Sequence, residues 1–212
     1  MVPLNERHAI FRVLADYTAR YEVIFDATWS QTTHPQDWPA PGHWSGLVGA
    51  VHNDRVQFFQ EGQTASEGIR LMAERGQQDT LLNEVAPALQ SGAAQFQLRG
   101  QGISVSPGMA RLTFPEPVRR DWPLVTLCSM VAPSPDWFVG VAGLSLLENG
   151  AWAREVTAVL YPFDAGTDSG LTFRSPDQVT TPRGVITRLT DFPVGQDGTV
   201  APFGTFTFQR LD

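Results

Sequence analysis

The stretches SMVAPSPDWFVG (residues 129–140) and YPFDAGTDSG (residues 161–170) each begin with an apolar run that ends in a turn rich in proline or glycine. An alternating apolar segment, residues 144–160, separates them and is interrupted by Glu148-Asn149-Gly150. Asn-Gly between two apolar runs is a strong signal for a β-hairpin. Because a hairpin returns the chain to the end it left, we expect the two turns to meet at one end of a sheet.

Both turns carry carboxylates, Asp136 in the first and Asp164 and Asp168 in the second. Three carboxylates in adjacent loops must either repel one another or share a cation, and calcium binds several oxygen ligands of this kind. By spacing alone an ordinary turn explains the second stretch, since Asp and Gly favour turns and the residues do not follow the EF-hand pattern. The hypothesis is a calcium site whose remaining ligands are backbone carbonyls and water.

Composition indicates a globular chain and excludes several classes of partner. The chain has 212 residues, 42% apolar and 17% charged, with a net charge of −7. This length is normal for a single all-β sandwich. All fifteen basic residues are Arg and they are scattered, so the basic stripe of a nucleic-acid-binding protein is missing. No apolar run is long enough for a transmembrane segment.

The single cysteine and the amino terminus bear on the cellular compartment. Cys128 lies within an apolar run, so we predict a buried thiol rather than a nucleophile, and it cannot form an internal disulfide. Residues 1–7 lack the basic and apolar regions of a signal peptide. From the sequence, either the protein is not exported or a leader has been removed.

Hydrophobic periodicity predicts mostly strands. Apolar residues alternate over residues 21–29, as in a half-buried strand. A capping box, Thr64 with Glu67, opens a first helix that ends at Gly76, and a second helix is predicted over residues 79–90. Further strands are predicted over residues 47–52, 95–98, 111–114, 123–131, 138–147, 152–161, 170–173, 185–189 and 199–210. We therefore expect a lead-in at residues 1–18 and one all-β domain at 19–212, an antiparallel β-sandwich with two short helices.

Several motifs resemble the spondin amino-terminal domain family, of F-spondin and mindin type. They occur in family order at residues 27–30, 43–45, 47–50, 65–68, 132–141 and 161–170. The chain lacks the thrombospondin-type repeats and the disulfide cysteines of the animal proteins, and its residues 92–121 do not match well. We therefore expect a stand-alone, prokaryotic version of the module.

The resemblance implies a sandwich similar to membrane-targeting C2 domains, with a calcium ion held by Asp136, Asp164 and Asp168. It also implies a secreted, extracellular or periplasmic protein that binds a cell-surface, matrix or glycan ligand and is not an enzyme. No catalytic residue is expected, because the motifs of hydrolases, P-loops and dinucleotide-binding proteins are missing.

Other interpretations of the same residues remain open. Asp136 and Asp164 could act as the carboxylate pair of a glycan hydrolase, or calcium could bridge a C2-like module to anionic lipid. His34, His43 and His52, with Asp37, could imitate a transition-metal site. One or two tryptophans in the long loop at residues 30–45 could form an exposed ligand platform.

Overall fold

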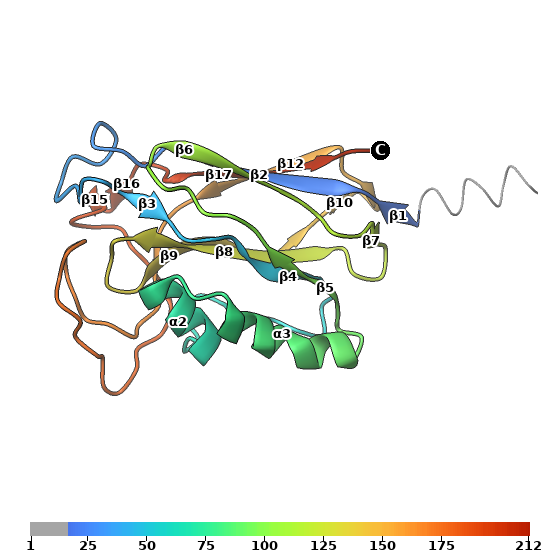
Figure 1. Ribbon diagram of the computed structural model, residues 1–212, viewed down its shortest axis with the longest axis horizontal. Coiled ribbons are helices and arrows are strands. Elements are labelled where there is room, and N and C mark those ends of the chain that lie inside the picture. The colour runs from blue at the N-terminus through green and yellow to red at the C-terminus, as the bar shows by residue number, and fades with distance from the viewer. Residues whose placement is uncertain (1–16) are drawn as a thin grey trace, which may run out of the picture.

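The computed structural model of the chain describes residues 17–212. Two antiparallel sheets face each other, and two helices cover the outer face of the larger sheet (Figure 1). The predicted class, an all-β antiparallel sandwich with two short helices, is confirmed. The lead-in predicted for residues 1–18 lies almost wholly outside the described residues, so the boundary at residue 19 stays a prediction.

The smaller sheet has four strands and bears the alternating pattern seen in the sequence. Along β2, Tyr21, Val23 and Phe25 are buried while the residues between them are partly or fully exposed. Each buried side chain points into the space between the sheets because successive residues of a strand face opposite sides. In spatial order the strands are β12 (Glu155–Leu160), β17 (Gly204–Arg210), β2 (Tyr21–Ala27) and β6 (Gly108–Thr113).

The larger sheet has seven strands and is centred on β8, a continuous apolar run buried on both faces. One face of β8 meets the smaller sheet and the other meets the helices, which is why its sequence does not alternate. The order is β14 (Thr187–Arg188), β13 (Phe163–Asp164), β9 (Trp137–Ser145), β8 (Leu124–Ala132), β4 (Val48–His52) and β5 (Ala94–Arg99), with β3 (His43–Trp44) beside β8.

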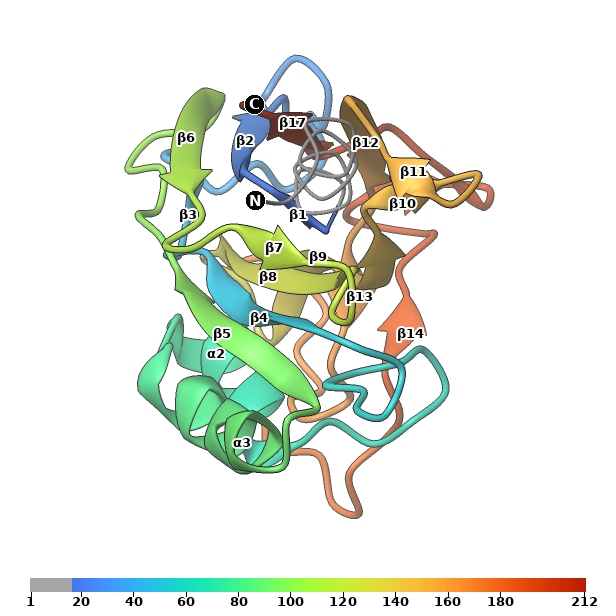
Figure 2. The same ribbon diagram turned by 90° about the vertical axis from the view of Figure 1, so that its right-hand side faces the viewer.

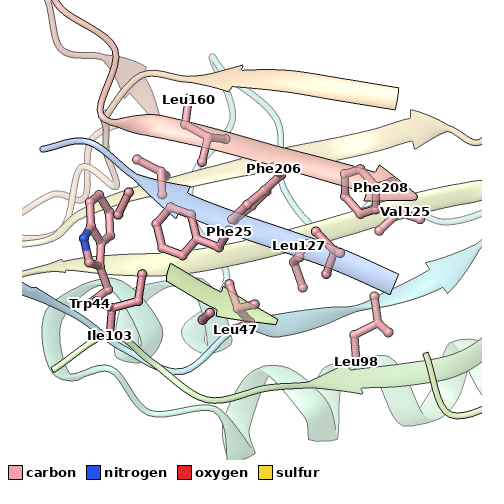
Figure 3. Close-up of a cluster of buried hydrophobic side chains, with 14 of the residues drawn as sticks. Phe25, Trp44, Leu47, Leu98, Ile103, Val125, Leu127, Leu160, Phe206 and Phe208 are labelled. Atoms are coloured by element: carbon pink, nitrogen blue, oxygen red, sulfur yellow. The ribbon is translucent and has the colours of Figure 1, made fainter. Parts of the chain in front are cut away.

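Aromatic side chains fill the core between the sheets (Figure 3). Phe25 lies with its ring centroid 5.0 Å from Phe206 and 4.9 Å from Trp44, both edge-on. Burying an aromatic ring of this size contributes on the order of 2–3 kcal/mol, and edge-to-face pairing adds to it. Three two-stranded pairs complete the structure: β1 (Thr18–Ala19) with β7 (Val118–Arg119), β10 (Leu147–Glu148) with β11 (Ala151–Trp152), and β15 (Gly195–Gln196) with β16 (Thr199–Val200).

Helix α2 (Glu67–Arg75) begins two residues later than the predicted capping box requires. Ser66 is the N-cap, and its hydroxyl accepts a hydrogen bond from the Ile69 backbone N–H. Glu84 of α3 (Asp79–Gln90) also binds this first turn, accepting from Gly68 N at 2.7 Å and from Ser66 Oγ at 2.6 Å. The predicted pairing of Thr64 with Glu67 is therefore wrong, because the N-cap is Ser66 and the Glu67 side chain accepts from Arg70 and Arg183 instead.

The ends and faces of the helices otherwise follow the sequence. Gly76 ends α2 in the left-handed conformation, and α3 continues through Pro87. The buried faces carry apolar residues that pack on the larger sheet: Ile69, Met72, Ala73, Leu81, Leu82, Val85 and Ala88. Within residues 17–212, neither the length nor the apolar character of any helix suits a membrane crossing.

The segment between the two turns does not form the simple hairpin expected from Asn149-Gly150. A tight hairpin does form there, but it joins only the two-residue strands β10 and β11. The long strands on either side, β9 and β12, belong to different sheets (Figure 2). The Asn-Gly turn thus lies where the chain crosses from the larger to the smaller sheet.

Three predicted strands differ in the structure. Residues 170–173 form a turn, because Ser175 Oγ accepts hydrogen bonds from the Leu171 and Thr172 backbone N–H groups. Residues 185–189 contain only the short strand β14. The strand predicted at 199–210 is divided into β16 and β17, and β17 buries one face fully and the other only in part.

Candidate functional site

The two acidic turns meet at one end of the larger sheet, as predicted. The contact is made by β13, which pairs antiparallel with β9 and places Asp164 opposite Trp137. The loop before β9 carries Asp136, and the loop after β13 carries Asp168. Because antiparallel neighbours run in opposite directions, these two loops must emerge at the same end.

Asp136 connects the two acidic turns. Its side chain is fully buried. One oxygen, Oδ2, accepts hydrogen bonds from Thr167 N at 2.7 Å, Thr167 Oγ1 at 3.1 Å and Asp168 N at 3.0 Å. The other oxygen, Oδ1, is buried without any partner. The Asp136 side chain therefore joins the two loops through Oδ2. Its Oδ1 remains available to accept a hydrogen bond or to bind a cation from outside the protein chain.

Burial and charge both oppose ionisation of Asp136. Burial raises the pKa of its carboxyl group most, the negative charge of Asp164 raises it further, and the hydrogen bonds from Thr167 and Asp168 oppose the rise. The resulting pKa is about 7, well above the ordinary value. A cation near Oδ1 would reverse both unfavourable effects by pairing with the charge.

Asp164 and Asp168 have different surroundings. Burial raises the pKa of Asp164, a hydrogen bond from Gly166 N at 2.6 Å and the neighbouring Trp137 indole lower it, and the charge of Asp168 raises it. Asp168 accepts from Gly170 N and from Gln178 N, both at 2.8 Å, one on each carboxylate oxygen. Asp168 is thus already held by backbone N–H groups, whereas Asp136 retains an unpaired oxygen.

These carboxylates do not form a closed cage. Across the part of the chain that the structure describes, no three side chains of Asp, Glu, His or Cys are grouped closely enough to hold a metal ion. The electrostatic contacts run from Asp136 to Asp164 and from Asp164 to Asp168. The donor set at this end is therefore all oxygen, which suits calcium, and it needs backbone carbonyls or water to complete it.

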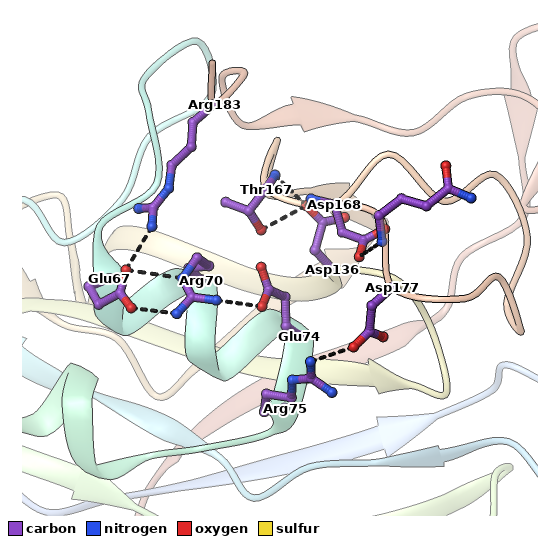
Figure 4. Close-up of polar contacts among 10 residues, drawn as sticks. Glu67, Arg70, Glu74, Arg75, Asp136, Thr167, Asp168, Asp177 and Arg183 are labelled. Carbon is purple, nitrogen blue, oxygen red and sulfur yellow. Dashed lines mark hydrogen bonds and ion pairs between the residues drawn. The ribbon is translucent and has the colours of Figure 1, made fainter. Parts of the chain in front are cut away.

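A long loop, residues 166–184, folds over the site and is tied to helix α2 (Figure 4). Its base is closed by Thr180 N donating to Thr167 O at 3.0 Å and Gly184 N donating to Gly166 O at 2.8 Å. Two ion pairs reach the helix: Arg75 with Asp177 at 2.5 Å, and Arg183 with Glu67 at 2.8 Å. The helix layer therefore helps to position the loop that carries Asp168.

Glu67 serves this connection rather than the metal site. It also binds Arg70, whose other side contacts Glu74. Hydrogen bonds from Arg70 and Arg183 lower the pKa of Glu67 to about 2. Since the side chain is half exposed and paired with two guanidinium groups, it is not directed at Asp136.

The histidines expected as an alternative metal site are kept apart. His34 is buried, with Nδ1 at 2.9 Å from Thr33 Oγ1 and Nε2 at 3.1 Å from Ala201 O. His52 contacts Asn53 O and Thr126 Oγ1 instead, and His43 is exposed. Burial lowers the pKa of both His34 and His52, so each is a neutral group within its own hydrogen-bond network.

Two further expectations concern buried side chains. Cys128 is fully buried, and burial raises its pKa strongly, which agrees with an inert thiol. The tryptophan platform is not formed: Trp44 is buried, and Trp38 packs against Trp29 with ring centroids 4.9 Å apart.

Sequence reasoning missed Thr167 and Asp37. Thr167 gives two of the three hydrogen bonds to Asp136, and its position between Gly166 and Asp168 was the only available signal. Asp37 Oδ2 accepts from Phe173 N at 2.8 Å and so ties the loop at residues 30–45 to the loop over the site. Nothing in the local sequence around Asp37 indicates that contact, because its partner lies far along the chain.

The chain is similar to proteins of the spondin family over most of its length. The Spondin_N family model matches residues 19–202. Spondin-2 of Homo sapiens is 38% identical over 199 residues, covering 91% of this chain and 57% of that protein. Spondin-1 of Rattus norvegicus is 33% identical over 191 residues, covering 88% of this chain and 24% of that protein.

The chain thus spans about half the length of Spondin-2 and about a quarter of Spondin-1. The match covers both acidic turns and nearly all strands of the two sheets. The resemblance noted in the sequence is confirmed, and the chain belongs to the Spondin_N family.

Proposed function

We propose that this protein is a calcium-binding recognition module that acts outside the cytoplasm, on a cell-surface, matrix or glycan ligand. The observation that carries the proposal is the unpaired, buried Oδ1 of Asp136 beside the charge of Asp164. A buried carboxylate oxygen without a partner is costly, and coordination of a cation removes that cost.

Asp136, Asp164 and Asp168 are the ligands in this proposal. Calcium supplies positive charge when bound, and it neutralises the carboxylates of two loops at once. Asp136 already contacts the backbone of the second loop through its Oδ2, so neutralisation at Oδ1 leaves those contacts in place. The recognition surface is then the rigid set of loops at this end of the sandwich.

Catalysis by the same carboxylates is disfavoured because a substrate cannot reach Asp136. A general acid must reach the reacting group of its substrate. Asp136 is fully buried beneath the loop that begins at Gly166, so a glycan could not contact it. The proposal therefore assigns no catalytic residue.

The location outside the cytoplasm follows from the family resemblance and from the chemistry. Extracellular calcium-binding modules often have dissociation constants of about 10⁻⁴ to 10⁻³ M, which is adequate only where calcium is abundant.

Thermal unfolding tests the metal site. Calcium should raise the melting temperature relative to the same protein in chelator, because a ligand that binds only the native state stabilises it. The double substitution Asp164→Asn with Asp168→Asn should abolish that rise. A matched control, Asp54→Asn with Asp197→Asn, removes the same two charges from exposed positions and should keep the rise. Equal melting temperatures of the wild type in calcium and chelator would reject the site.

A second candidate function, calcium-dependent binding to membranes, is favoured by apolar side chains near this end. Leu171 is 76% exposed and Val179 is 81% exposed, and both lie on the loop over the site. Apolar loop tips beside a cation can insert at a lipid surface. Liposomes of anionic lipid should then sediment the protein only in calcium, and Leu171→Ser with Val179→Ser should abolish this. Sedimentation that ignores calcium, or no sedimentation, would exclude the second candidate.

A further inference from the structure

A groove with a volume of about 480 Å³ runs between the two sheets on the side where β9 and β12 lie. Figure 2 shows β12 at the edge of the smaller sheet, with β9 and β13 in the larger sheet. The lining combines apolar strand residues, two aromatic rings and single charges of each sign; those used below are Phe59, Gly140, Val141, Ala142, Val159, Phe163 and Arg188.

The wall of the groove is an unpaired strand edge. β9 has β8 along one side, but on the other side β13 pairs only with Trp137 and Phe138. Beyond Phe138, no strand of the described chain covers that side of β9. Such an edge presents free backbone groups in the pattern that another extended strand can bind.

The direction of those backbone groups follows from the register. Asp136 O accepts a hydrogen bond from Ala165 N, so the backbone polar groups of residue 136 point toward β13. Backbone direction alternates along an antiparallel strand. Residues 138, 140 and 142 therefore point the same way, and the N–H and C=O groups of Gly140 and Ala142 face the groove. Gly143 N donates to Thr126 Oγ1 on the β8 side, and beyond Ala142 the register of the β8–β9 pair shifts between Val125 and Leu127.

The groove lies along the edge itself and not over one face. Its lining includes Gly140 and Ala142, whose positions face one side of the sheet, and Val141, which packs toward the core on the other side. Val159 of β12, 52% exposed, forms the opposite wall. A chain lying in this groove would thus have backbone partners on one side and apolar contacts on the other.

Charge at one end of the groove indicates what the chain should carry. The Arg188 guanidinium lies 5.4 Å from the centroid of the Phe163 ring and 5.3 Å from that of Tyr161. Arg188 is exposed and makes no ion pair within residues 17–212, in a protein whose net charge is −7. A guanidinium placed over aromatic rings without an ion-pair partner keeps its N–H groups available for a carboxylate.

We propose that this groove binds an extended peptide segment of a partner protein, which adds a strand to the free edge of β9 and places an acidic side chain against Arg188. The backbone of Gly140 and Ala142 supplies the hydrogen bonds, as in other cases of strand addition. Phe59 and Val159 supply apolar contacts to alternate side chains. Asp136, Asp164 and Asp168 do not line this groove, so the peptide proposal does not depend on a metal ion at the acidic turns.

The test begins with a phage-displayed library of random linear peptides, panned against the full chain in calcium-containing buffer. Enriched peptides should contain Asp or Glu within a stretch of β-forming residues. Hydrogen exchange in the presence of a synthetic enriched peptide should slow at the amides of Gly140 and Ala142, because those N–H groups become hydrogen-bonded.

Two substitutions locate the binding. Ala142→Pro removes an N–H on the edge of β9 that no strand of residues 17–212 pairs with, and proline is tolerated at such positions. It should weaken peptide binding by about tenfold, which is the effect of losing one well-formed hydrogen bond. Arg188→Glu should weaken the same peptides by about tenfold or more through charge reversal. Arg119→Glu makes the same change at an exposed arginine outside the groove and should have no effect.

Melting curves of each variant show that a loss of binding is not a loss of folding. The proposal is overturned if no peptide is enriched, or if enriched peptides bind Ala142→Pro and Arg188→Glu as they bind the wild type. It is also overturned if exchange slows elsewhere. A concentration-dependent dimer that Ala142→Pro abolishes would replace the peptide with a second copy of this chain.

Discussion

Asp136→Asn should raise the melting temperature of the calcium-free protein at pH above 7 and should remove its response to calcium. The two effects have opposite signs and one cause. In the calcium-free protein the Asp136 charge is buried beside that of Asp164, so removing it relieves a penalty. In the proposed calcium-bound state the same charge is a ligand, so removing it should eliminate the stabilisation that the ion provides.

The expected size follows from the pKa. A rise from the ordinary 3.8 to about 7 corresponds to roughly 4 kcal/mol of unfolding free energy when the group is fully charged. For a protein of this size, that energy is a change of melting temperature on the order of 10 °C. The substituted amide can still accept the hydrogen bonds from Thr167 and Asp168 through its oxygen, so the loop contacts are retained.

The control is Asp54→Asn, which removes an exposed carboxylate and should change neither the calcium-free melting temperature nor the response to calcium. If Asp136→Asn instead lowered the melting temperature in chelator and left the calcium response intact, Asp136 would be a structural hydrogen-bonding residue only.

The second large effect is a fall in the stability of the calcium-free protein as pH rises from about 4 to about 7. The folded-state pKa of Asp136 is raised above its unfolded value, so between these limits the native state binds more protons than the unfolded state. Unfolding free energy then decreases with increasing pH and levels off above the folded-state pKa. Asp164, whose pKa is also raised by burial, adds to the fall.

Urea unfolding at a series of pH values, in chelator, measures this slope directly. Saturating calcium should remove most of the fall, because the ion favours the charged carboxylates. Asp136→Asn in chelator should flatten the curve in the same range. An unfolding free energy that rises between pH 4 and 7 in chelator would contradict the burial of an unpaired carboxylate at this position.

The sequence predicted that the two acidic turns meet, but through a hairpin at Asn149-Gly150, whereas the contact is made by β13 pairing with β9. The alternating residues of β2 were predictable because one face of that strand is buried and the other is not. The route between the turns was not predictable. Asn149-Gly150 identifies a tight turn, but a turn signal does not specify which sheet each flanking strand joins.

Contacts between distant segments account for the remaining errors. Glu84 caps α2 from another helix, so the local pattern of Thr64 and Glu67 was misleading. Leu171 and Phe173 look like neighbours in a strand, yet Phe173 is buried against Trp137 while Leu171 is exposed. The burial of Phe173 depends on how the loop at residues 166–184 folds, and hydrophobic periodicity over three residues cannot detect that fold.

The burial and hydrogen bonding of Asp136 also depend on contacts between distant segments. Its residue type and its turn were visible in the sequence, and they were sufficient to predict an acidic site. Its complete burial, its contacts with Thr167 and its unpaired Oδ1 depend on β13 lying beside β9. These features support the proposed cation site over an ordinary aspartate turn.

Isothermal titration of the purified chain with calcium, after treatment with chelator, is the most direct test of the central claim. The account predicts saturable binding of a single ion per chain in wild type and in Asp54→Asn, and no measurable binding in Asp136→Asn. No saturable heat in the wild type up to millimolar calcium, or unchanged binding in Asp136→Asn, would contradict it.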